Sequence, residues 1–215
     1  MQEQLAESVL SVQPTVPTIF VVDDDAAVRR SLTRLLRSAG WNAEAFASAG
    51  DLLDRAPITG PGCLLLDVQM PGMNGLELHE HISKEGISLP VVFLTGKGDI
   101  PMSVNAMKHG AVDFLVKPVA EEVLFKALDE AIRRQAAEAA TRRVRDTIMA
   151  RLARLSGREL EVLQHVLRGH LNKQIAYELG IVEKTVKVHR GRLMEKMEAH
   201  TVAELVHMCD AVEFK

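Results

Sequence analysis

The 215-residue chain has few cysteines and no long hydrophobic run. Cys63 and Cys209 are its two cysteines, and they lie in segments that we assign to different domains. A disulfide is therefore not expected, and a reducing cytoplasm fits. No apolar run approaches the roughly 20 residues of a membrane-spanning helix, and residues 1–12 hold no Lys or Arg, which argues against a secretory signal. These absences predict a cytoplasmic protein of one or two domains without a membrane partner.

An excess of positive charge is also missing. The formal net charge is −3, and residues 1–120 carry more acidic than basic side chains. Residues 156–215 hold equal numbers of both. The C-terminal part is therefore not a basic nucleic-acid-binding domain overall, and any contact with DNA must depend on a local stripe of charge.

The most informative stretch runs from Cys63 to Gly75. An apolar run ends abruptly in Asp67, and turn-forming residues follow it: Pro71, Gly72, Asn74 and Gly75. Such a run without alternation predicts a strand that is buried on both faces. Asp67 then lies at the carboxyl end of a central strand, where open α/β sheets carry their sites. An isolated Asp would more often simply begin a loop. The interpretation of Asp67 as a site residue therefore depends on the other acidic residues of the chain.

Four more segments have strand character, and helical patterns separate them. The strands are expected at Thr18 to Asp25, Trp41 to Phe46, Pro90 to Thr95 and Asp113 to Lys117. The helices are expected at Ala26 to Ser38, Ser48 to Arg55, Leu76 to Lys84 and Ile100 to His109, with Asp25 and Ser48 as N-caps. Residues 1–17 read as a flexible leader. The alternation predicts an α/β fold with a doubly wound, five-stranded parallel sheet.

The chain is expected to be helical from Glu121 to about Leu155. A stripe of apolar residues would cover the sheet: Val123, Leu124, Leu128 and Ile132. Beyond Arg133 the segment is rich in Ala, Arg and Glu, which favours an exposed helix. We interpret residues 134–154 as a helical linker between a sheet domain, 18–133, and a second domain, 155–215.

The second domain is predicted to be all-α with four helices. Ser156 and Glu159 have capping-box spacing before the first helix, and Asn172 is expected to cap the second, which Gly180 closes. Glu183 to Met197 and Thr201 to Val212 complete the set. A short turn containing Gly joins the second and third helices, which is typical of a helix-turn-helix.

Polar side chains follow the ends of neighbouring strands, and they should converge. They are Asp23, Asp24, Asp67, Thr95 and Lys117. Carboxylates this close need a compensating cation, and oxygen ligands with room for water favour Mg²⁺. A carboxylate, Mg²⁺, an ammonium and a hydroxyl together form a receptor for a phosphoryl group in transfer onto Asp67.

The motifs V-V-D-D-D, L-L-L-D-x-x-M-P-G-M-N-G, F-L-T-G and Lys117-Pro118 occur in this order and resemble the flavodoxin-like receiver domain of two-component response regulators. The resemblance implies that Asp67 accepts the phosphoryl group. It also implies that Asp23, Asp24, Asp67 and the backbone carbonyl of Gln69 hold Mg²⁺. Thr95 and Lys117 would bind the phosphoryl oxygens, Thr95 and Phe114 would act as switch residues, and the Lys117–Pro118 peptide bond would be cis.

The C-terminal motifs L-S-G-R-E-L-E-V-L, N-K-Q-I-A-Y-E-L-G and K-T-V-K-V-H-R-G-R-L-M-E-K-M resemble the helix-turn-helix domain of the FixJ, NarL and LuxR group. A recognition helix would bring Lys187 and Val188 to base edges. The expected phosphate contacts are Lys184, Thr185, Arg190, Arg192 and Lys173. Lys196 adds charge at the flank of this helix. Gly191 stands where many relatives have a longer polar side chain, which leaves fewer atoms for reading DNA.

Both resemblances predict a phosphorylation-dependent transcriptional regulator. A sensor histidine kinase would phosphorylate Asp67, the receivers would form a homodimer, and the dimer would bind promoter DNA, with RNA polymerase as a further partner to consider. The protein is not expected to be an enzyme beyond slow hydrolysis of its own aspartyl phosphate, with Gln69 and Lys97 influencing the lifetime. Two alternatives remain, namely a Mg²⁺-dependent phosphohydrolase and a constitutive DNA-binding protein with a purely structural receiver.

Overall fold

The computed structural model describes residues 16–55, 58, 60–96, 104, 106–108 and 110–214. The predicted leader up to residue 15, Lys97 and much of the predicted helix Ile100 to His109 lie outside these residues. The chain divides into two compact units between Glu138 and Ala139, and each unit is described by itself.

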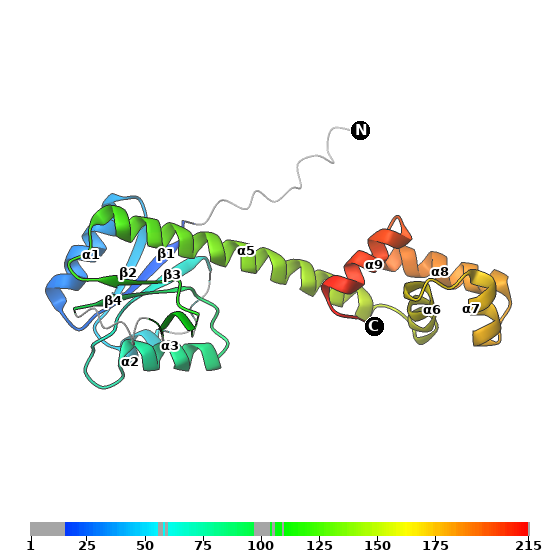
Figure 1. Cartoon of the computed structure of the whole chain (residues 1–215), viewed down its shortest axis with the longest axis horizontal. Helices are drawn as coiled ribbons and strands as arrows, with labels where there is room; N and C mark the ends of the chain where they lie inside the picture. Colours follow the sequence, from blue (N-terminus) through cyan, green and yellow to red (C-terminus); the bar gives the residue numbers. More distant parts are fainter. Residues whose placement is uncertain are drawn as a thin grey trace. The chain divides into compact units, whose positions relative to one another are not determined.

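The first unit contains the predicted five-stranded parallel sheet (Figure 1). Its strands are β1 (Thr18–Val22), β2 (Asn42–Phe46), β3 (Gly62–Asp67), β4 (Val91–Thr95) and β5 (Asp113–Val116), in the order β2-β1-β3-β4-β5. The register pairs Val22 with Leu66 and Asp67 with Leu94, so the strands end nearly level. The strand order reverses direction between β1 and β3, which is where such sheets place their ligands.

Helices cover both faces of the sheet (Figure 1). One apolar cluster joins Ile19 of β1 to Leu36 of α1 (Ala26–Ser38) and Leu128 of α5 (Glu121–Ala153). The other joins Phe20 of β1 to side chains of α2 (Ala49–Asp54) and α3 (Gly75–Lys84). Neighbouring strand residues therefore point to opposite cores, which explains why the strands read as continuous apolar runs.

Helices α1 and α2 start at their predicted caps, whereas the predicted apolar stripe of α5 contains one error. Asp25 accepts the backbone N–H of Ala27 at 2.7 Å, and Ser48 caps α2. Val123, however, is 49% exposed, so its place in the buried stripe was wrong. The covered stripe is centred one residue later in the helix: Leu124, Ala127, Leu128 and Ala131. The two alanines allow close packing on the sheet, although their small side chains give a weak signal in the sequence.

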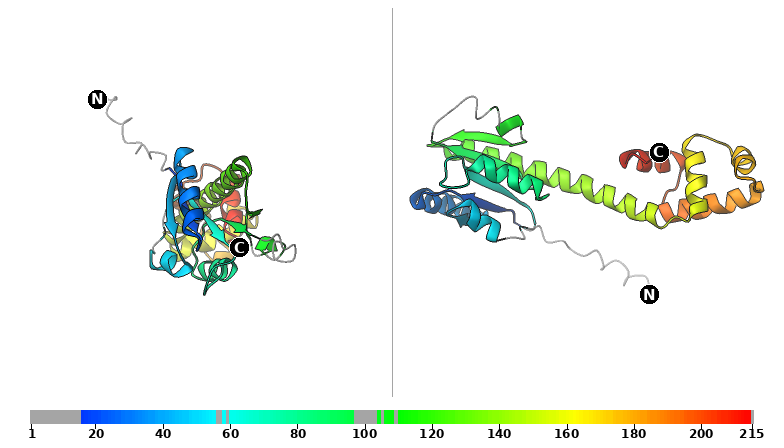
Figure 2. Two further views of the ribbon diagram at one scale, coloured as in Figure 1. Left: turned by 90° about the vertical axis from the view of Figure 1, so that its left-hand side faces the viewer. Right: turned by 90° about the horizontal axis from the view of Figure 1, so that it is seen from below.

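The described residues of the second unit are helical, as Figure 2 shows. They form the end of α5 together with α6 (Gly157–Leu167), α7 (Asn172–Leu179), α8 (Glu183–Met197) and α9 (Val202–Ala211). Residues 134–153 of the predicted linker lie within the single long helix α5. Residues 136–147 are exposed as predicted, whereas Ile148 and Leu152 near the end of the helix are buried in the core of this unit.

The predicted cap of α7 was also wrong. Asn172 is the first residue of the helix, and Leu171 precedes it without a side-chain cap. The Asn172 amide oxygen instead accepts a hydrogen bond from the guanidinium of Arg190 at 2.8 Å. The amide therefore ties α7 to α8, and it is not available to the backbone of its own helix. Gly180, with a φ of 64°, ends α7 as predicted.

Both cysteines are buried and unpaired, as the sequence predicts. Burial raises the pKa of the Cys63 thiol to about 12. Burial and the nearby charge of Asp210 also raise the pKa of Cys209. Among the described residues, no helix combines the length and apolar character required to cross a membrane.

An ion pair between Lys196 and a buried carboxylate joins helices α6 and α8 of the second unit. The Lys196 ammonium donates to Glu159 at 2.7 Å, and the Glu159 side chain is only 3% exposed. Glu159 also forms the predicted capping box with Ser156. The hydrogen bonds from Lys196 and from the Ser156 backbone lower the pKa of Glu159 from 4.5 to about 2.

We expect Glu159→Gln to destabilise the second unit by about 3 kcal/mol at neutral pH. The folded carboxyl has the lower pKa, so its contribution is present above about pH 4.5 and is lost as the pH falls toward 2. Urea unfolding by circular dichroism across this range measures it, with Trp41 fluorescence reporting the first unit separately. Glu161→Gln, which removes an exposed carboxylate paired with Arg158, is the matched control. Equal acid sensitivity in wild type and Glu159→Gln would contradict the assignment.

Candidate functional site

The acidic side chains predicted to converge do meet at the carboxyl ends of β1 and β3. Asp23, Asp24 and Asp67 each offer a carboxylate oxygen, and these oxygens lie within 4.8 Å of one another. Asp23 is fully buried and Asp67 is 6% exposed, whereas Asp24 is exposed. The cluster is therefore buried on the protein side and open on the side of Asp24.

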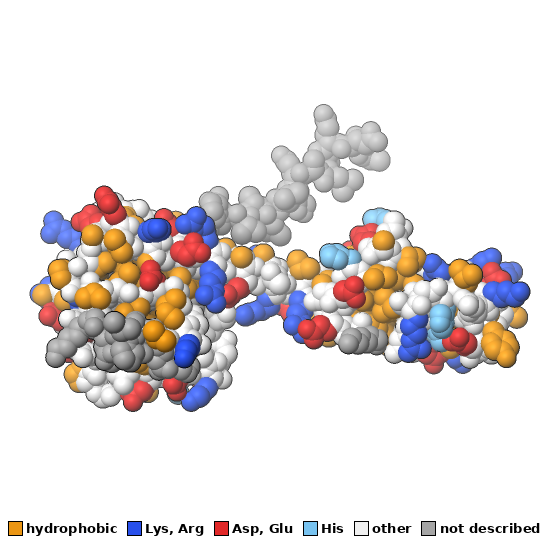
Figure 3. Space-filling model, in the orientation of Figure 1, with side chains coloured by type: hydrophobic (Ala, Val, Ile, Leu, Met, Phe, Trp, Pro, Cys, Tyr) orange, Lys and Arg blue, Asp and Glu red, His pale blue; other side chains and the backbone are white. Residues whose placement is uncertain are grey.

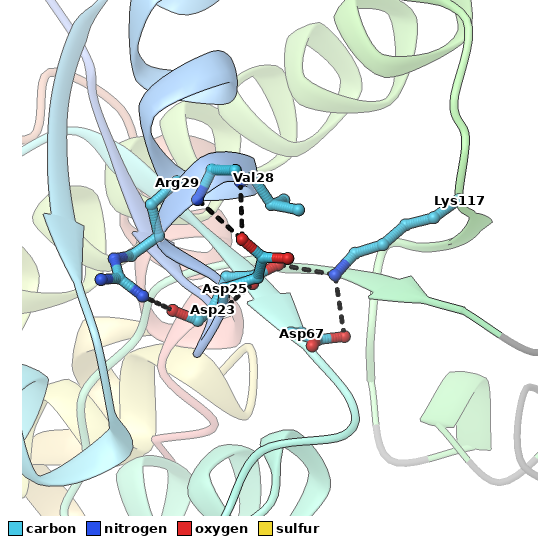
Figure 4. A network of polar contacts seen from close by, with 7 residues as sticks. Asp23, Asp25, Val28, Arg29, Asp67 and Lys117 are labelled. Carbon is cyan, nitrogen blue, oxygen red and sulfur yellow. Dashed lines mark hydrogen bonds and ion pairs between the residues drawn. The ribbon is translucent and has the colours of Figure 1, made fainter.

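Lys117, which follows β5, reaches across the strand ends into this cluster (Figure 4). Its ammonium lies 2.6 Å from Asp23 Oδ2 and 3.2 Å from Asp67 Oδ1. The Lys117–Pro118 peptide bond is cis, as the sequence resemblance implies. Lys117 is thus a positive point charge held between the two buried carboxylates.

Further hydrogen bonds hold Asp23 in place. The Asp25 backbone N–H donates to Asp23 Oδ1 at 2.9 Å, and the Arg29 guanidinium donates to the Asp23 carbonyl at 2.6 Å. Arg29 belongs to no motif in the sequence, although its place one turn into α1 puts it within reach of Asp23. The acidic run thus has divided roles, since Asp25 caps α1 while Asp23 points into the cluster (Figure 4).

Within the cluster, burial and the neighbouring charges have opposite effects on the pKa values of Asp67 and Lys117. Burial raises the pKa of Asp67, and the charge of Lys117 only partly counters it. Burial by itself lowers the pKa of Lys117, but its hydrogen bond to Asp23 and the charges of both carboxylates outweigh burial and raise it. Two buried carboxylates with one ammonium leave excess negative charge, which favours an additional cation.

The donor set fits Mg²⁺. Three carboxylates supply hard oxygen ligands, and the exposed side leaves space for the waters that this ion retains. Asp67 Oδ1 is buried, and its contact with Lys117 lacks the alignment of a hydrogen bond, so it keeps unused acceptor capacity. Asp23, Asp24 and Asp67 are the side chains that would hold the ion.

We expect Lys117→Met to destabilise the first unit by about 3 kcal/mol without Mg²⁺, because it leaves two buried carboxylates without their counter-charge. Excess Mg²⁺ should restore much of this loss by supplying the missing positive charge. Urea unfolding followed by Trp41 fluorescence, with and without Mg²⁺, measures both effects. Lys84→Met is the control, because Lys84 is exposed and its ion pair with the exposed Glu80 is long, at 3.7 Å. The same loss of unfolding free energy with and without Mg²⁺ would contradict the role of Lys117 as the counter-charge of the two carboxylates.

The remaining predicted residues of this site surround Asp67. Thr95 ends β4 and is buried, and the half-buried Phe114 on β5 contacts the ring of Phe93, with centroids 6.2 Å apart. The Gln69 backbone amide hydrogen-bonds the Asp67 carboxyl. The structure thus places Thr95, Gln69 and Lys117 on segments that directly follow or end strands β3, β4 and β5.

The turn after Asp67 is held tightly against the strand. Asn74 caps α3 and forms a capping box with Glu77. The Gly75 backbone N–H donates to the Val68 carbonyl at 3.1 Å. A Cβ at Gly75 would lie only 2.2 Å from the Asp67 carbonyl oxygen. Gly75 therefore permits α3 to begin directly against the residue that carries the site.

The predicted DNA-binding residues lie on α7 and α8 in the second unit. Val186, Leu193 and Met197 face the core, whereas Lys184, Lys187, Val188 and Arg192 are exposed. Figure 3 shows Lys and Arg side chains over the part of this unit that contains α7 and α8. Lys173 is exposed near the start of α7, and Thr185 is partly buried. His189 is half-buried.

Three basic residues on α8 have partners within the unit. Arg190 donates to Asn172, and Lys196 pairs with buried Glu159, so the charge of Lys196 is neutralised. Lys187 pairs with Glu183 at 3.2 Å on the exposed face. The stripe is therefore weaker in isolation than a count of charges indicates. These pairings depend on contacts between helices, which the periodicity of one helix does not reveal.

Comparisons with known proteins match both units. A family model described as "Response regulator receiver domain" matches residues 19–129. A second, "Bacterial regulatory proteins, luxR family", matches residues 153–209. The receiver match lies in the first unit, and the luxR-family match lies in the second unit.

Several full-length proteins are similar along nearly the whole chain. Nodulation protein W of Bradyrhizobium diazoefficiens is 42% identical over 92% of this chain and 87% of its own. The transcriptional regulatory protein FixJ of the same species is 42% identical, covering 88% of this chain and 93% of its own. The solved structure of the response regulator StyR is 46% identical and superposes with a TM-score of 0.83, covering 91% and 98% of the two chains.

Proposed function

Because the chain belongs to the response regulators that join a receiver domain to a LuxR-type DNA-binding domain, we propose that phosphorylation of Asp67 controls its binding to DNA. The two domains make it a two-component transcriptional regulator. A sensor histidine kinase is the proposed source of the phosphoryl group, and promoter DNA is the proposed target. RNA polymerase would be engaged only by the DNA-bound form.

The observation that carries the proposal is the convergence of Asp67 with Asp23, Asp24 and Lys117. Asp67 has a buried carboxylate oxygen with unused acceptor capacity, and its carboxyl group belongs to the cluster that is open on the side of Asp24. Bound Mg²⁺ would neutralise negative charge on the incoming phosphoryl oxygens. Lys117 is already within 3.2 Å of Asp67, so its ammonium needs only a small shift to contact one of those oxygens. A carboxylate oxygen of Asp67 would then bond to phosphorus and form an aspartyl phosphate, while the phosphorus–nitrogen bond to the kinase histidine breaks and that histidine leaves.

Thr95 and Phe114 are the proposed switch residues. The Thr95 hydroxyl ends the strand beside β3, and a phosphoryl group on Asp67 would offer it a strong acceptor. A shift of Thr95 would change the space beside Phe114, which lies on the adjacent strand β5. The half-buried ring would then repack and change the outer surface of β5. This surface is the proposed contact of the phosphorylated homodimer.

We do not propose turnover of external phosphate esters. A phosphohydrolase with an aspartate nucleophile usually uses a second carboxylate as acid and base near it, and Gln69, two residues after Asp67, carries an amide. Slow hydrolysis of the aspartyl phosphate is the expected extent of catalysis. Multiple turnover of a small phosphate ester would favour the enzyme alternative.

For the DNA-binding domain, α8 is the proposed recognition helix. Lys187 and Val188, both exposed on α8, would face base edges. Lys184, Thr185, Arg190, Arg192 and Lys173 would contact phosphates. The Arg190–Asn172 hydrogen bond supports this geometry, since it fixes α7 and α8 against each other at the proposed DNA face.

The direct test is phosphorylation with a small-molecule phosphoryl donor, measured by intact-protein mass spectrometry. We expect one phosphoryl group per chain in the presence of Mg²⁺, located by peptide mapping after reductive trapping at Asp67. Removal of divalent cations with a chelator should abolish the modification, and added Mg²⁺ should restore it. Modification at another residue, or equal modification without Mg²⁺, would contradict the proposed chemistry.

A further inference from the structure

Three side chains of the DNA-binding domain form a cluster that the proposed function does not use. His165 lies in the last turn of α6, His170 in the following loop and Glu178 in the last turn of α7. The two Nδ1 atoms are 3.2 Å apart, and they lie 2.9 Å and 3.5 Å from Glu178 Oε2. Two ring nitrogens and one carboxylate oxygen thus form a compact triangle.

The backbone holds the two histidines together. Gly169 follows α6 with a φ of 80°, a conformation that suits glycine, and it turns the chain back over the helix end. The His170 N–H donates to the His165 carbonyl at 3.1 Å. The imidazole rings then lie 5.3 Å apart between centroids, with a 31° angle between their planes. The pair is part of the helix-ending turn.

The protonation of the two rings decides what the triangle can hold. If both Nδ1 atoms carry a proton, both N–H groups can donate to the Glu178 carboxylate oxygen, and the triangle has no place for a cation. If only one carries a proton, that single hydrogen cannot lie on all three edges, and the other nitrogen directs a lone pair at the carboxylate. If neither carries a proton, three lone pairs converge. The last arrangement is favourable only with a cation at the centre.

The geometry points to a binding site for a divalent transition-metal ion, with Zn²⁺ as the best match, held by His165 Nδ1, His170 Nδ1 and Glu178 Oε2. Zinc bonds to nitrogen and oxygen of about 2.1 Å give about 3.4 Å between ligands in a tetrahedron. The observed edges of 2.9, 3.2 and 3.5 Å are close to this value. Imidazole nitrogen distinguishes this site from the all-oxygen cluster at Asp67.

The site is accessible from solvent. The side chains of His165, His170 and Glu178 are 13%, 29% and 42% exposed. An ion can therefore enter, and water can occupy the fourth position of a three-ligand site. The bound ion would link His170 in the α6–α7 loop to Glu178 at the end of α7. Because Asn172 of the same helix holds Arg190, the ion would also stabilise the support of α8.

The test uses the untagged full-length protein, freed of metal and titrated with Zn²⁺ by calorimetry. We expect one binding event that His170→Ala weakens by at least about tenfold, since even the loss of an outer partner of a metal ligand costs that much. Glu178→Gln should weaken the same event. His200→Gln, which changes an exposed histidine outside the cluster, should bind as wild type does. Asp24→Asn should also retain the event, because it changes only the receiver cluster.

Co²⁺ provides a second readout that a purely structural effect would not produce. Visible ligand-field bands of a four-coordinate nitrogen–oxygen site are expected with wild type and Asp24→Asn and should be absent with His170→Ala and Glu178→Gln. Circular dichroism checks the fold of each variant. Wild-type affinity in both cluster variants, or loss of the event in Asp24→Asn, would overturn the assignment.

Discussion

Asp67→Asn should remain monomeric, and should bind DNA weakly, under conditions in which Mg²⁺ and a phosphoryl donor convert the wild type into a dimer. The substitution keeps the size and burial of the side chain, but it replaces the nucleophilic carboxylate with an amide. Without the aspartyl phosphate, the Thr95 hydroxyl has no new acceptor to move toward, and the space beside Phe114 does not change. Because two linked DNA-binding domains bind paired half-sites about 10²- to 10⁴-fold more tightly than one, this is the largest functional effect we expect.

Sedimentation of both proteins with Mg²⁺, with and without the donor or beryllofluoride, measures the association. Fluorescence anisotropy with duplex DNA carrying paired half-sites selected by the phosphorylated wild type measures the affinity. Asp54→Asn is the matched control, because it removes one exposed carboxylate at the end of α2 and should behave as wild type. Donor-dependent dimerisation of Asp67→Asn would refute the mechanism. Equal DNA affinity of wild type with and without donor would instead support a constitutive binder.

Gly75→Ala should be among the most damaging single-methyl additions to the receiver domain. Its Cβ would meet the Asp67 carbonyl oxygen at 2.2 Å and the Val68 Cα at 3.2 Å. Both obstacles are backbone atoms, so relief requires movement of the β3–α3 connection itself. We expect a loss of about 3 kcal/mol or more in unfolding free energy, at the upper end of overpacking effects, together with slower phosphorylation of Asp67.

Urea unfolding followed by Trp41 fluorescence measures the stability loss, and intact mass after a fixed exposure to the donor measures phosphorylation. Gly50→Ala is a close control, since Gly50 also lies in the first turn of a helix and its Cβ would have only Ser48 Oγ nearby, at 3.7 Å. That change should raise stability by about 0.5–1 kcal/mol, because alanine favours helix more than glycine does. Equal stabilities for Gly75→Ala and wild type would show that the connection can move without cost.

The sequence was sufficient to predict the sheet and the convergence of Asp23 with Asp67, because both depend on local patterns. Buried parallel strands appear as continuous apolar runs, and a polar residue that ends such a run must lie at one edge of the sheet. Asp25 and Ser48 were identified as caps for a similar reason, since a cap involves residues only two or three positions apart.

Two of the errors concern partners that are distant in the sequence. Lys196 was counted toward the positive charge at the flank of the recognition helix, but Glu159, 37 residues earlier, neutralises it. Asn172 was assigned to its own helix, but Arg190 of α8 takes its amide oxygen. In each case several partners suited the side chain chemically, and only the packing of helices against one another selects among them. His165, His170 and Glu178 escaped notice for the same reason.

The state of the two cysteines has a practical consequence for labelling. Maleimides and spin labels react with exposed thiolates, whereas Cys63 and Cys209 are buried and the pKa of each thiol is raised. A cysteine introduced at an exposed position, such as Glu80 on α3, would then be the one thiol that a short exposure to reagent modifies. Probes for distance measurements between the domains can therefore be attached without first replacing the natural cysteines.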